Sequence, residues 1–479
     1  MEQRREIRLR QQPRIPVTDV TARAGRIDRP RRRPRGAHAA GVVILAQFLL
    51  RAASAAGALL VGSYFVDLAH HGVPISSLVL GALSALAYLA ELILAPLSGS
   101  LSDLKGRRLF LVVAPLVAAV GIVLTPGASV FNATPPLAMV VAIVGVSRLI
   151  DGTSAAMATP ATLGLLADST DEDRHRRGRL NSMYELSSSG GIAVGAVIGP
   201  ALYADTGLWA FTVLAGIYAI AGILVATFTR TDRPKADTTP VTLRRRLKIF
   251  SNRQLLAFLP SWIAVNAILG TWVTSQITYV LAGDRAFPGQ RFTGSLAHHP
   301  AWLSPILGGY VLLFSVCIIG WSFIVGRLPT LPTLTVTISG AVLTSAGLIM
   351  ANHGIALTVA IPIVVVGVFL EAGFTPAALT HLSDISADFR PNRGLIMGVY
   401  SVVLGVGYLL GNLLGGVFAQ WLAFDGLGLL TILLAIIALT TIPGMMLAER
   451  RHGRTREAPP RDSSTSTPVS ARPNDDATQ

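Results

Sequence analysis

The sequence predicts an all-α membrane protein in which twelve transmembrane helices form two pseudo-symmetric bundles of six. The first observation is composition: 14% of the 479 residues are charged and 51% are hydrophobic, whereas soluble proteins average about 25% charged residues. The second is that apolar runs of about 20 residues, the length that crosses a bilayer core, recur along the whole chain. The third is an internal repeat, which relates the second half of the chain to the first.

Twelve apolar runs qualify as membrane spans. Their predicted limits are 40–66, 76–98, 109–126, 137–167, 179–203, 208–228, 254–282, 304–326, 332–350, 356–383, 394–420 and 427–447. Counted with Arg179 at the edge of the fifth span, the loops after even-numbered spans hold eighteen Lys and Arg residues, and the opposite loops hold two, Arg285 and Arg291. Positive loops stay on the cytoplasmic side, so we expect both termini in the cytoplasm and the protein in the inner (cytoplasmic) cell membrane.

Polar segments flank and divide these spans. Residues 1–38, with twelve arginines, and residues 449–479 are expected to form disordered cytoplasmic tails. Residues 229–253 are expected to be a basic cytoplasmic linker between bundles 39–228 and 254–448. The net charge of +14 thus lies mainly in tails and loops, where it suits the lipid bilayer as a partner rather than nucleic acid. We expect a monomer.

The repeat appears when the chain is shifted by 216 residues, which aligns spans 4–5 with spans 10–11. Thirteen residues are then identical, among them Pro160 with Pro376, Tyr184 with Tyr400, and three glycines spaced by four with three others. Such agreement at Pro, Gly and Tyr indicates two parallel repeats. Transporters that rock two such halves around a mid-membrane site are built in this way.

The glycines of the repeat predict close helix packing, because a residue without a side chain lets two helix backbones approach. The predicted packing residues are Gly191, Gly195, Gly199 and Pro200 in span 5, and Gly407, Gly411 and Gly415 in span 11.

The stretch "GSLSDLKGRR" between spans 2 and 3 resembles the G-x-L-x-D-x-x-G-R-R signature of the major facilitator superfamily. Its matching residues include Gly99, Asp103, Gly106, Arg107 and Arg108. The resemblance implies a conformational latch made of these residues. In it, Asp103 would hold the two halves together on the cytoplasmic side, toward span 11 and Arg108, in the outward-open state.

Two further motifs resemble those of proton-coupled members of that family. Span 4 reads "RLIDGTSAA", similar to R-x-x-x-G-x-x-x-A, with Arg148, Gly152 and Ala156 matching. Span 5 reads "GIAVGAVIGPAL", similar to the antiporter motif, although Tyr203 and Ala204 stand where a glycine pair is expected. The resemblance implies alternating access with protons and a small-molecule substrate as partners.

Ionisable residues within the spans are the candidates for proton coupling or substrate contact, because charge inside a membrane is costly and usually functional. The candidates are Arg51, Glu91, Arg148, Asp151 and Glu371, and the polar Asn266 of span 7 joins them. A sixth charged residue, Glu185, lies near the cytoplasmic end of span 5, where we expect it to form an ion pair. Arg148 and Asp151 are three residues apart and can pair on one helix face. A structural ion pair is the alternative role for them. Arg51 could bind an anion or pair with an acid.

These observations leave two transport hypotheses open. The first is proton-coupled efflux of a drug or metabolite by antiport, and the alternative is import of a small anionic metabolite by symport or uniport. A membrane receptor or scaffold on the same fold is a third reading. An enzyme is not expected, because no phosphate-binding loop or His pair at metal spacing occurs. We expect no cofactor and no metal, and the single Cys317 excludes an internal disulfide.

Overall fold

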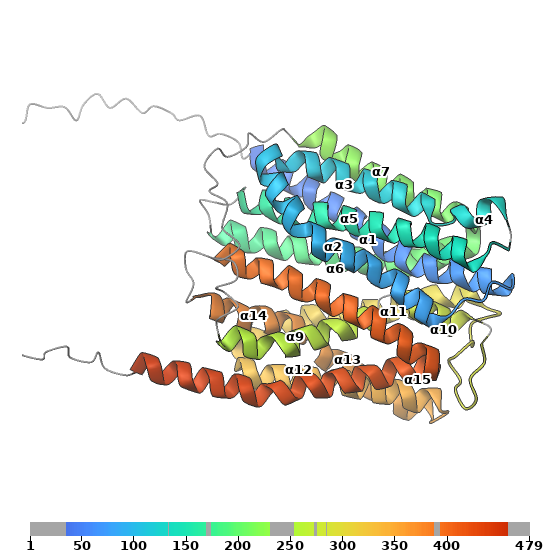
Figure 1. Cartoon of the computed structure of the whole chain (residues 1–479). Helices are drawn as coiled ribbons and strands as arrows, with labels where there is room; N and C mark the ends of the chain where they lie inside the picture. Colours follow the sequence, from blue (N-terminus) through green and yellow to red (C-terminus); the bar gives the residue numbers. More distant parts are fainter. Residues whose placement is uncertain are drawn as a thin grey trace, which may run out of the picture.

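The computed structural model describes residues 35–132, 134–168, 174–229, 253–272, 275–283, 285–387 and 393–457. In this part of the chain, helices are joined by loops and turns, and no strand occurs (Figure 1). Eleven segments of this part of the chain are long and apolar enough to cross a membrane. The last, Val402–Ala448, has 47 residues and bends at Ala423. At 1.5 Å per residue it is about 70 Å long, enough for two crossings. The predicted all-α membrane fold is confirmed, and the bend supplies the twelfth span.

The first half of the chain contributes a group of helices that pack on one another. They are α1 (Arg35–His70), α2 (Ser77–Lys105), α3 (Arg107–Leu124), α4 (Gly127–Phe131), α5 (Leu137–Asp168), α6 (Arg174–Thr206) and α7 (Trp209–Phe228). Helix α1 packs against α6 and α7, and α2 against α5. Helix α2 begins after Ser76, whose hydroxyl caps it by accepting from the Val79 N–H. It ends at Gly106, which has φ +95°, a value that glycine tolerates best.

The second half is built from α9 (Arg253–Trp272), α10 (Ser275–Ala282), α11 (Leu303–Ser322), α12 (Thr330–Asn352), α13 (Leu357–Glu371), α14 (Phe374–Ala387) and α15 (Arg393–Glu457). Short 3₁₀ turns, Pro300–Trp302 and Val325–Arg327, precede and follow α11. Helix α15 packs along α9 and α12, and α12 packs against α13.

One span that we predicted as a continuous helix is divided in the structure, since the predicted span 356–383 appears as α13 and α14. Pro376 explains this division, because its ring clashes with the carbonyl four residues earlier in a continuous helix, and Ala372 lies at the break. The equivalent Pro160 leaves α5 unbroken, so the two halves differ at this repeated position. The predicted span 254–282 contains α9 and α10, and the two residues between them lie outside the described residues.

The helices also extend beyond the predicted tail boundaries. Helix α1 begins at Arg35, within the predicted tail 1–38, and α15 continues to Glu457, beyond the predicted tail start at 449. Most of the predicted linker 229–253 lies outside the described residues. The start of α1 and the end of α15 lie on the same side of the molecule (Figure 1). We call this side the terminal face and the opposite side the far face.

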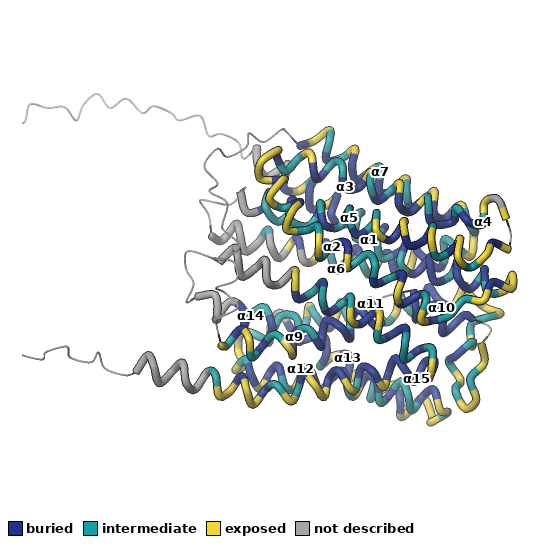
Figure 2. The backbone as a smooth tube through the Cα atoms, in the orientation of Figure 1, coloured by how far each residue is buried: buried dark blue, intermediate teal, exposed yellow. Residues whose placement is uncertain are grey.

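The predicted packing glycines bring helix backbones together within each half. A Cβ atom on Gly191, Gly195 or Gly199 of α6 would come closer than 3.0 Å to the backbone of α1, and one on Gly411 would do so to the backbone of α9. Gly407 lies against Asn266 of α9, and Gly415 lies beside Gln276 of α10. Pro200 lies inside α6. Buried residues follow these inner faces (Figure 2), whereas large apolar side chains such as Val120 and Ile93 point outward, as lipid contact requires.

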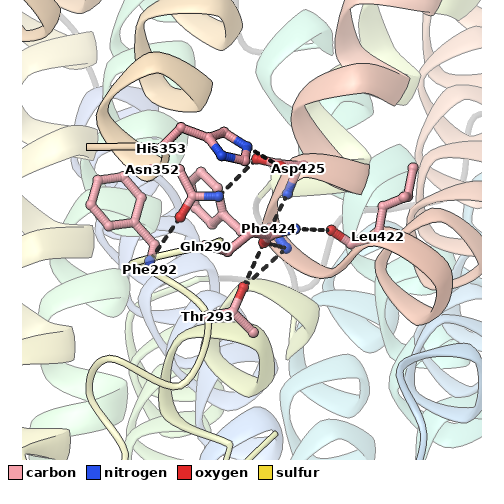
Figure 3. Close-up of polar contacts among 8 residues, drawn as sticks. All are labelled: Gln290, Phe292, Thr293, Asn352, His353, Leu422, Phe424 and Asp425. Atoms are coloured by element: carbon pink, nitrogen blue, oxygen red, sulfur yellow. Dashed lines mark hydrogen bonds and ion pairs between the residues drawn. The ribbon is translucent and has the colours of Figure 1, made fainter. Parts of the chain in front are cut away.

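The bend of α15 is fastened by the loop that follows α10 (Figure 3). The Gln290 side-chain Nε2 donates to the Leu422 carbonyl at 2.7 Å, and its Oε1 accepts from the Phe424 N–H at 3.1 Å. One amide therefore satisfies a free carbonyl before the bend and a free N–H after it.

The turn after α12 holds the same bend from the other side (Figure 3). Asp425 accepts from Asn352 Nδ2 at 2.7 Å and lies 2.6 Å from His353 Nε2. Asn352 Oδ1 in turn accepts from the Phe292 N–H at 2.8 Å. The connection between the last two spans is thus fixed by hydrogen bonds from two separate loops.

Replacing Ala423 with glycine should stabilise the protein. Ala423 has φ 51° and ψ −126°, a conformation that costs a residue with a Cβ of order 1 kcal/mol or more and that glycine adopts readily. We expect the thermal midpoint of the detergent-purified protein to rise by a few degrees. Ala419→Gly, four residues earlier in regular helix, is the control and should lower the midpoint. A fall in both variants would show that the bend carries no strain.

Candidate functional site

The two halves of the protein meet in close contact near the far face. Helix α2 crosses α15 there, and a Cβ atom on Gly81 would lie 2.5 Å from the Asn412 carbonyl oxygen and 2.8 Å from the Gly416 Cα. Since both are backbone atoms that cannot rotate away, only glycine fits at position 81 in this conformation.

Helix α10 belongs to the second half of the chain but packs on α1 and α2 of the first half, also near the far face. The Ser275 hydroxyl donates to the Ala58 carbonyl at 2.6 Å, and the Tyr279 hydroxyl donates to the Ile75 carbonyl at 3.0 Å. The far face is therefore closed by direct contacts of α10 and α15 with α1 and α2.

A polar cavity of about 80 Å³ lies at mid-depth below this closure. Arg51, near the middle of α1, is part of its wall. Other residues of the wall are Ser54 of α1, Tyr88 and Glu91 of α2, Arg148 and Asp151 of α5, Tyr218 of α7, Ser275 of α10 and Asn412 of α15. Ligand pockets commonly measure roughly 300–1,000 Å³, so in this conformation the cavity admits only a small molecule or a few waters.

Four of the six predicted candidates, Arg51, Glu91, Arg148 and Asp151, thus come together from three helices around one space. Arg148 Nη1 lies 3.4 Å from Asp151 Oδ2, and the Arg148 side chain is almost fully buried. Arg148 Nη2 also lies 3.4 Å from the Ser147 hydroxyl. The predicted pairing of these two residues along one helix face is present in the structure.

Arg51 and Glu91 face the same cavity without touching an opposite charge. Among the described residues, no carboxylate lies within 4 Å of the Arg51 guanidinium, and no cationic nitrogen lies within 4 Å of the Glu91 carboxylate. The two groups attract each other over a longer distance, and Arg51 also hydrogen-bonds Tyr184 of α6. The cavity therefore contains one formed ion pair and two further charges of opposite sign that do not touch.

The other two predicted candidates lie away from this cavity. Asn266 is buried in α9 and donates from Nδ2 to the Trp262 carbonyl of its own helix at 2.8 Å. Glu371 is the last residue of α13 and is also buried. A Cβ atom on Gly340 would come closer than 3.0 Å to the Glu371 backbone nitrogen, so Glu371 lies against α12.

The loop 2–3 signature lies at the terminal face, where α2 turns into α3. Asp103 pairs with Arg107 at 3.0 Å, and Arg108 Nη2 donates to the Ala226 carbonyl of α7. The expected partnership of Asp103 with Arg108 is thus replaced by one with Arg107 in this conformation. Gly99 faces α5, and a Cβ atom on Gly99 would lie 3.5 Å from the Pro160 Cβ.

Sequence reasoning missed several residues of the cavity wall, namely Tyr88, Tyr218, Ser275 and Asn412. Asn412 follows Gly411 of the repeated glycine pattern, and this was the one signal that could have drawn attention to it. Tyrosines and serines in apolar helices carry no comparable pattern. Among the residues described, no group of three His, Cys, Asp or Glu side chains could hold a metal ion.

Comparison with known proteins agrees with this architecture. A family model described as Major Facilitator Superfamily matches residues 39–386 and 306–473. Among solved structures, a bacterial homologue of the human lysosomal transporter Spinster, inward-facing and unoccupied, superposes with a TM-score of 0.65 at 12% identity, covering 89% of this chain and 100% of that one. The nucleoside transporter NupG gives a TM-score of 0.64 at 14% identity, covering 86% and 99%.

A search of curated proteins finds no match. At such low identities the similarity to solved structures shows a shared fold and does not identify a substrate. The family match, however, spans most of the chain, and the closed contact between two helical halves above a polar cavity is consistent with it. The chain belongs to the major facilitator superfamily and is a multi-pass membrane transporter.

Proposed function

We propose that this transporter works by alternating access and exports a small molecule in exchange for protons. The observation that carries the proposal is the mid-depth cavity, in which Glu91 and Asp151 lie beside two arginines below a closed far face. Carboxylates inside a membrane bind protons readily, and neighbouring charges tune their affinity. Substrate and proton could therefore compete for the same space.

The distribution of positive charge supports an orientation for this movement. If the eighteen Lys and Arg residues of one set of loops are cytoplasmic, then both termini are cytoplasmic and the far face is external. The conformation described is then closed to the outside. Transport would require α10 and α15 to separate from α1 and α2 while the terminal face closes.

Proteoliposomes that contain a pH-sensitive dye test the exchange. Substrates are first selected by screening drugs and metabolites for altered growth and uptake in a null strain. We expect a substrate gradient to drive protons in the opposite direction. If the gradient moves substrate and leaves the internal pH unchanged, the proton exchange is wrong.

A second candidate is import of a small anionic metabolite by symport or uniport. Arg51 favours it, because a guanidinium near the middle of a span, with no carboxylate of the described residues within 4 Å, is suited to bind a carboxylate or phosphate. The same proteoliposomes separate the two candidates, since protons would enter together with the substrate in symport and would not move in uniport.

Replacing Asp103 with asparagine should slow transport more than it lowers the amount of folded protein. Its ion pair with Arg107 is nearly half exposed on the Asp103 side, and such pairs contribute only about 0–1 kcal/mol to stability. Initial transport rates and the yield of monodisperse protein measure the two effects. Asp205→Asn removes an exposed acid from the far end of α6 and is the control. Equal losses of rate and yield would make Asp103 a folding residue.

A further inference from the structure

Two opposite charges of the cavity have no charged partner. Arg51 of α1 and Glu91 of α2 both line it, and neither has an opposite charge within 4 Å among the residues described. The remaining charges, Arg148 and Asp151, already pair with each other at 3.4 Å. Arg51 hydrogen-bonds Tyr184, and Arg51 and Glu91 attract each other without forming a direct ion pair. A ligand in this space therefore meets one cation and one carboxylate that are not in direct contact with an opposite charge.

The charge of the ligand decides how well these groups are satisfied. A ligand with a single negative charge would pair with Arg51 and offset the attraction that Arg51 exerts on Glu91, which leaves the Glu91 carboxylate poorly compensated, and a simple amine would do the reverse. An unpaired charge in a poorly hydrated site is costly. A molecule that carries both charges satisfies both residues at once.

The size and the remaining wall point to a short molecule. The cavity measures about 80 Å³, far below the roughly 300–1,000 Å³ of drug-sized sites. Ser275 and Asn412 complete its wall from the second half of the protein. A ligand bound at Arg51 and Glu91 would therefore also contact the two helices that close the far face.

We propose that the transported substrate is a small zwitterion, with its anionic group bound by Arg51 and its ammonium group bound by Glu91. This inference rests on the proposed transport function and specifies its substrate. It also gives the exchange a physical basis. An ammonium group and a proton compete for the Glu91 carboxylate, so that protonation of Glu91 favours release of the substrate, as proton exchange requires.

Binding to the purified full-length protein in detergent tests the charge requirement without transport. The probes are amino acids from glycine and β-alanine to 6-aminohexanoate, with the n-alkanoate and n-alkylamine of matched length for each. We expect at least one zwitterion to bind about tenfold or more tightly than both of its singly charged analogues. No binding by any zwitterion, or equal binding of an analogue, would overturn the proposal.

Two charge-neutralising variants assign the groups. In Arg51→Gln the affinity for the zwitterion should fall to that of the matched amine, and in Glu91→Gln to that of the matched alkanoate. Arg253→Gln and Asp205→Asn remove exposed charges outside the cavity and should leave the affinities unchanged. Thermal unfolding checks that each variant is folded. If both cavity variants weaken all three ligand classes equally, the residues support the site without reading charge.

The outcome is separable from that of the proposed function. Zwitterion selectivity without proton counterflow in proteoliposomes would retain the binding assignment and refute proton exchange. A substrate with one charge or none could instead be the one that moves with protons, in an order of substrate preference that Arg51→Gln leaves unchanged. That result would support proton-coupled transport and refute the zwitterion as substrate.

Discussion

Replacing Gly81 with leucine should hold the two halves apart on the far face and lower transport by about tenfold or more. A Cβ at this position would lie 2.5 Å from the Asn412 carbonyl oxygen and 2.7 Å from Gln276 Nε2, so α2 and α15 cannot approach as they do here. Forcing a side chain into so close a contact costs about 1–3 kcal/mol, which shifts a balanced equilibrium toward the open state. Folding should survive, because the clash lies between the halves.

Distances between spin labels measure this shift directly. After Cys317→Ser removes the native cysteine, labels at His71 and Ile355 report the separation of the halves at the far face. We expect a longer distance in Gly81→Leu than in the parent protein. Gly216→Leu is the matched control, because nothing lies within 4 Å of a Cβ at Gly216. An unchanged distance together with lost transport would mean that the closed contact is not the affected step.

Most of the architecture could be predicted because apolar length and glycine spacing act locally. A membrane span can be recognised from its own apolar composition, and a glycine every fourth residue places small residues on one helix face. Gly195 and Gly411 accordingly lie against the backbones of α1 and α9. The sequence also singled out the four charged residues that converge on the cavity, since charge stands out in an apolar helix.

The remainder depends on contacts between distant segments. Helix α10, in the second part of the seventh span, packs on α1 of the other half, and composition does not reveal this contact. Asn266 and Gln276 are both amides of that span, yet Asn266 bonds to its own helix and Gln276 to the Asn412 carbonyl. The partner of each amide depends on how its helix is rotated about the helix axis. Packing across the whole protein sets that rotation.

Replacing Arg148 with glutamine should destabilise the protein and abolish transport. Arg148 is buried, and its loss leaves Asp151, about a quarter exposed, without a cation in the membrane interior. Removing one partner of a buried pair costs up to roughly 3–5 kcal/mol, and we expect somewhat less here because Asp151 contacts the cavity. Chemical or thermal unfolding in detergent measures the loss.

The double variant Arg148→Gln with Asp151→Asn separates stability from function. Without either charge no ion is left unpaired, so most of the lost stability should return, with a coupling of about 1–3 kcal/mol between the two sites. Transport should stay lost, because the double variant keeps only Arg51 and Glu91 of the four cavity charges and lacks the electrostatic influence of Asp151 on Glu91. A double variant that regains proton-coupled transport would show that the pair only fastens α5. Glu91, which lies on α2 and lines the same cavity, would then exchange the proton without help from the pair.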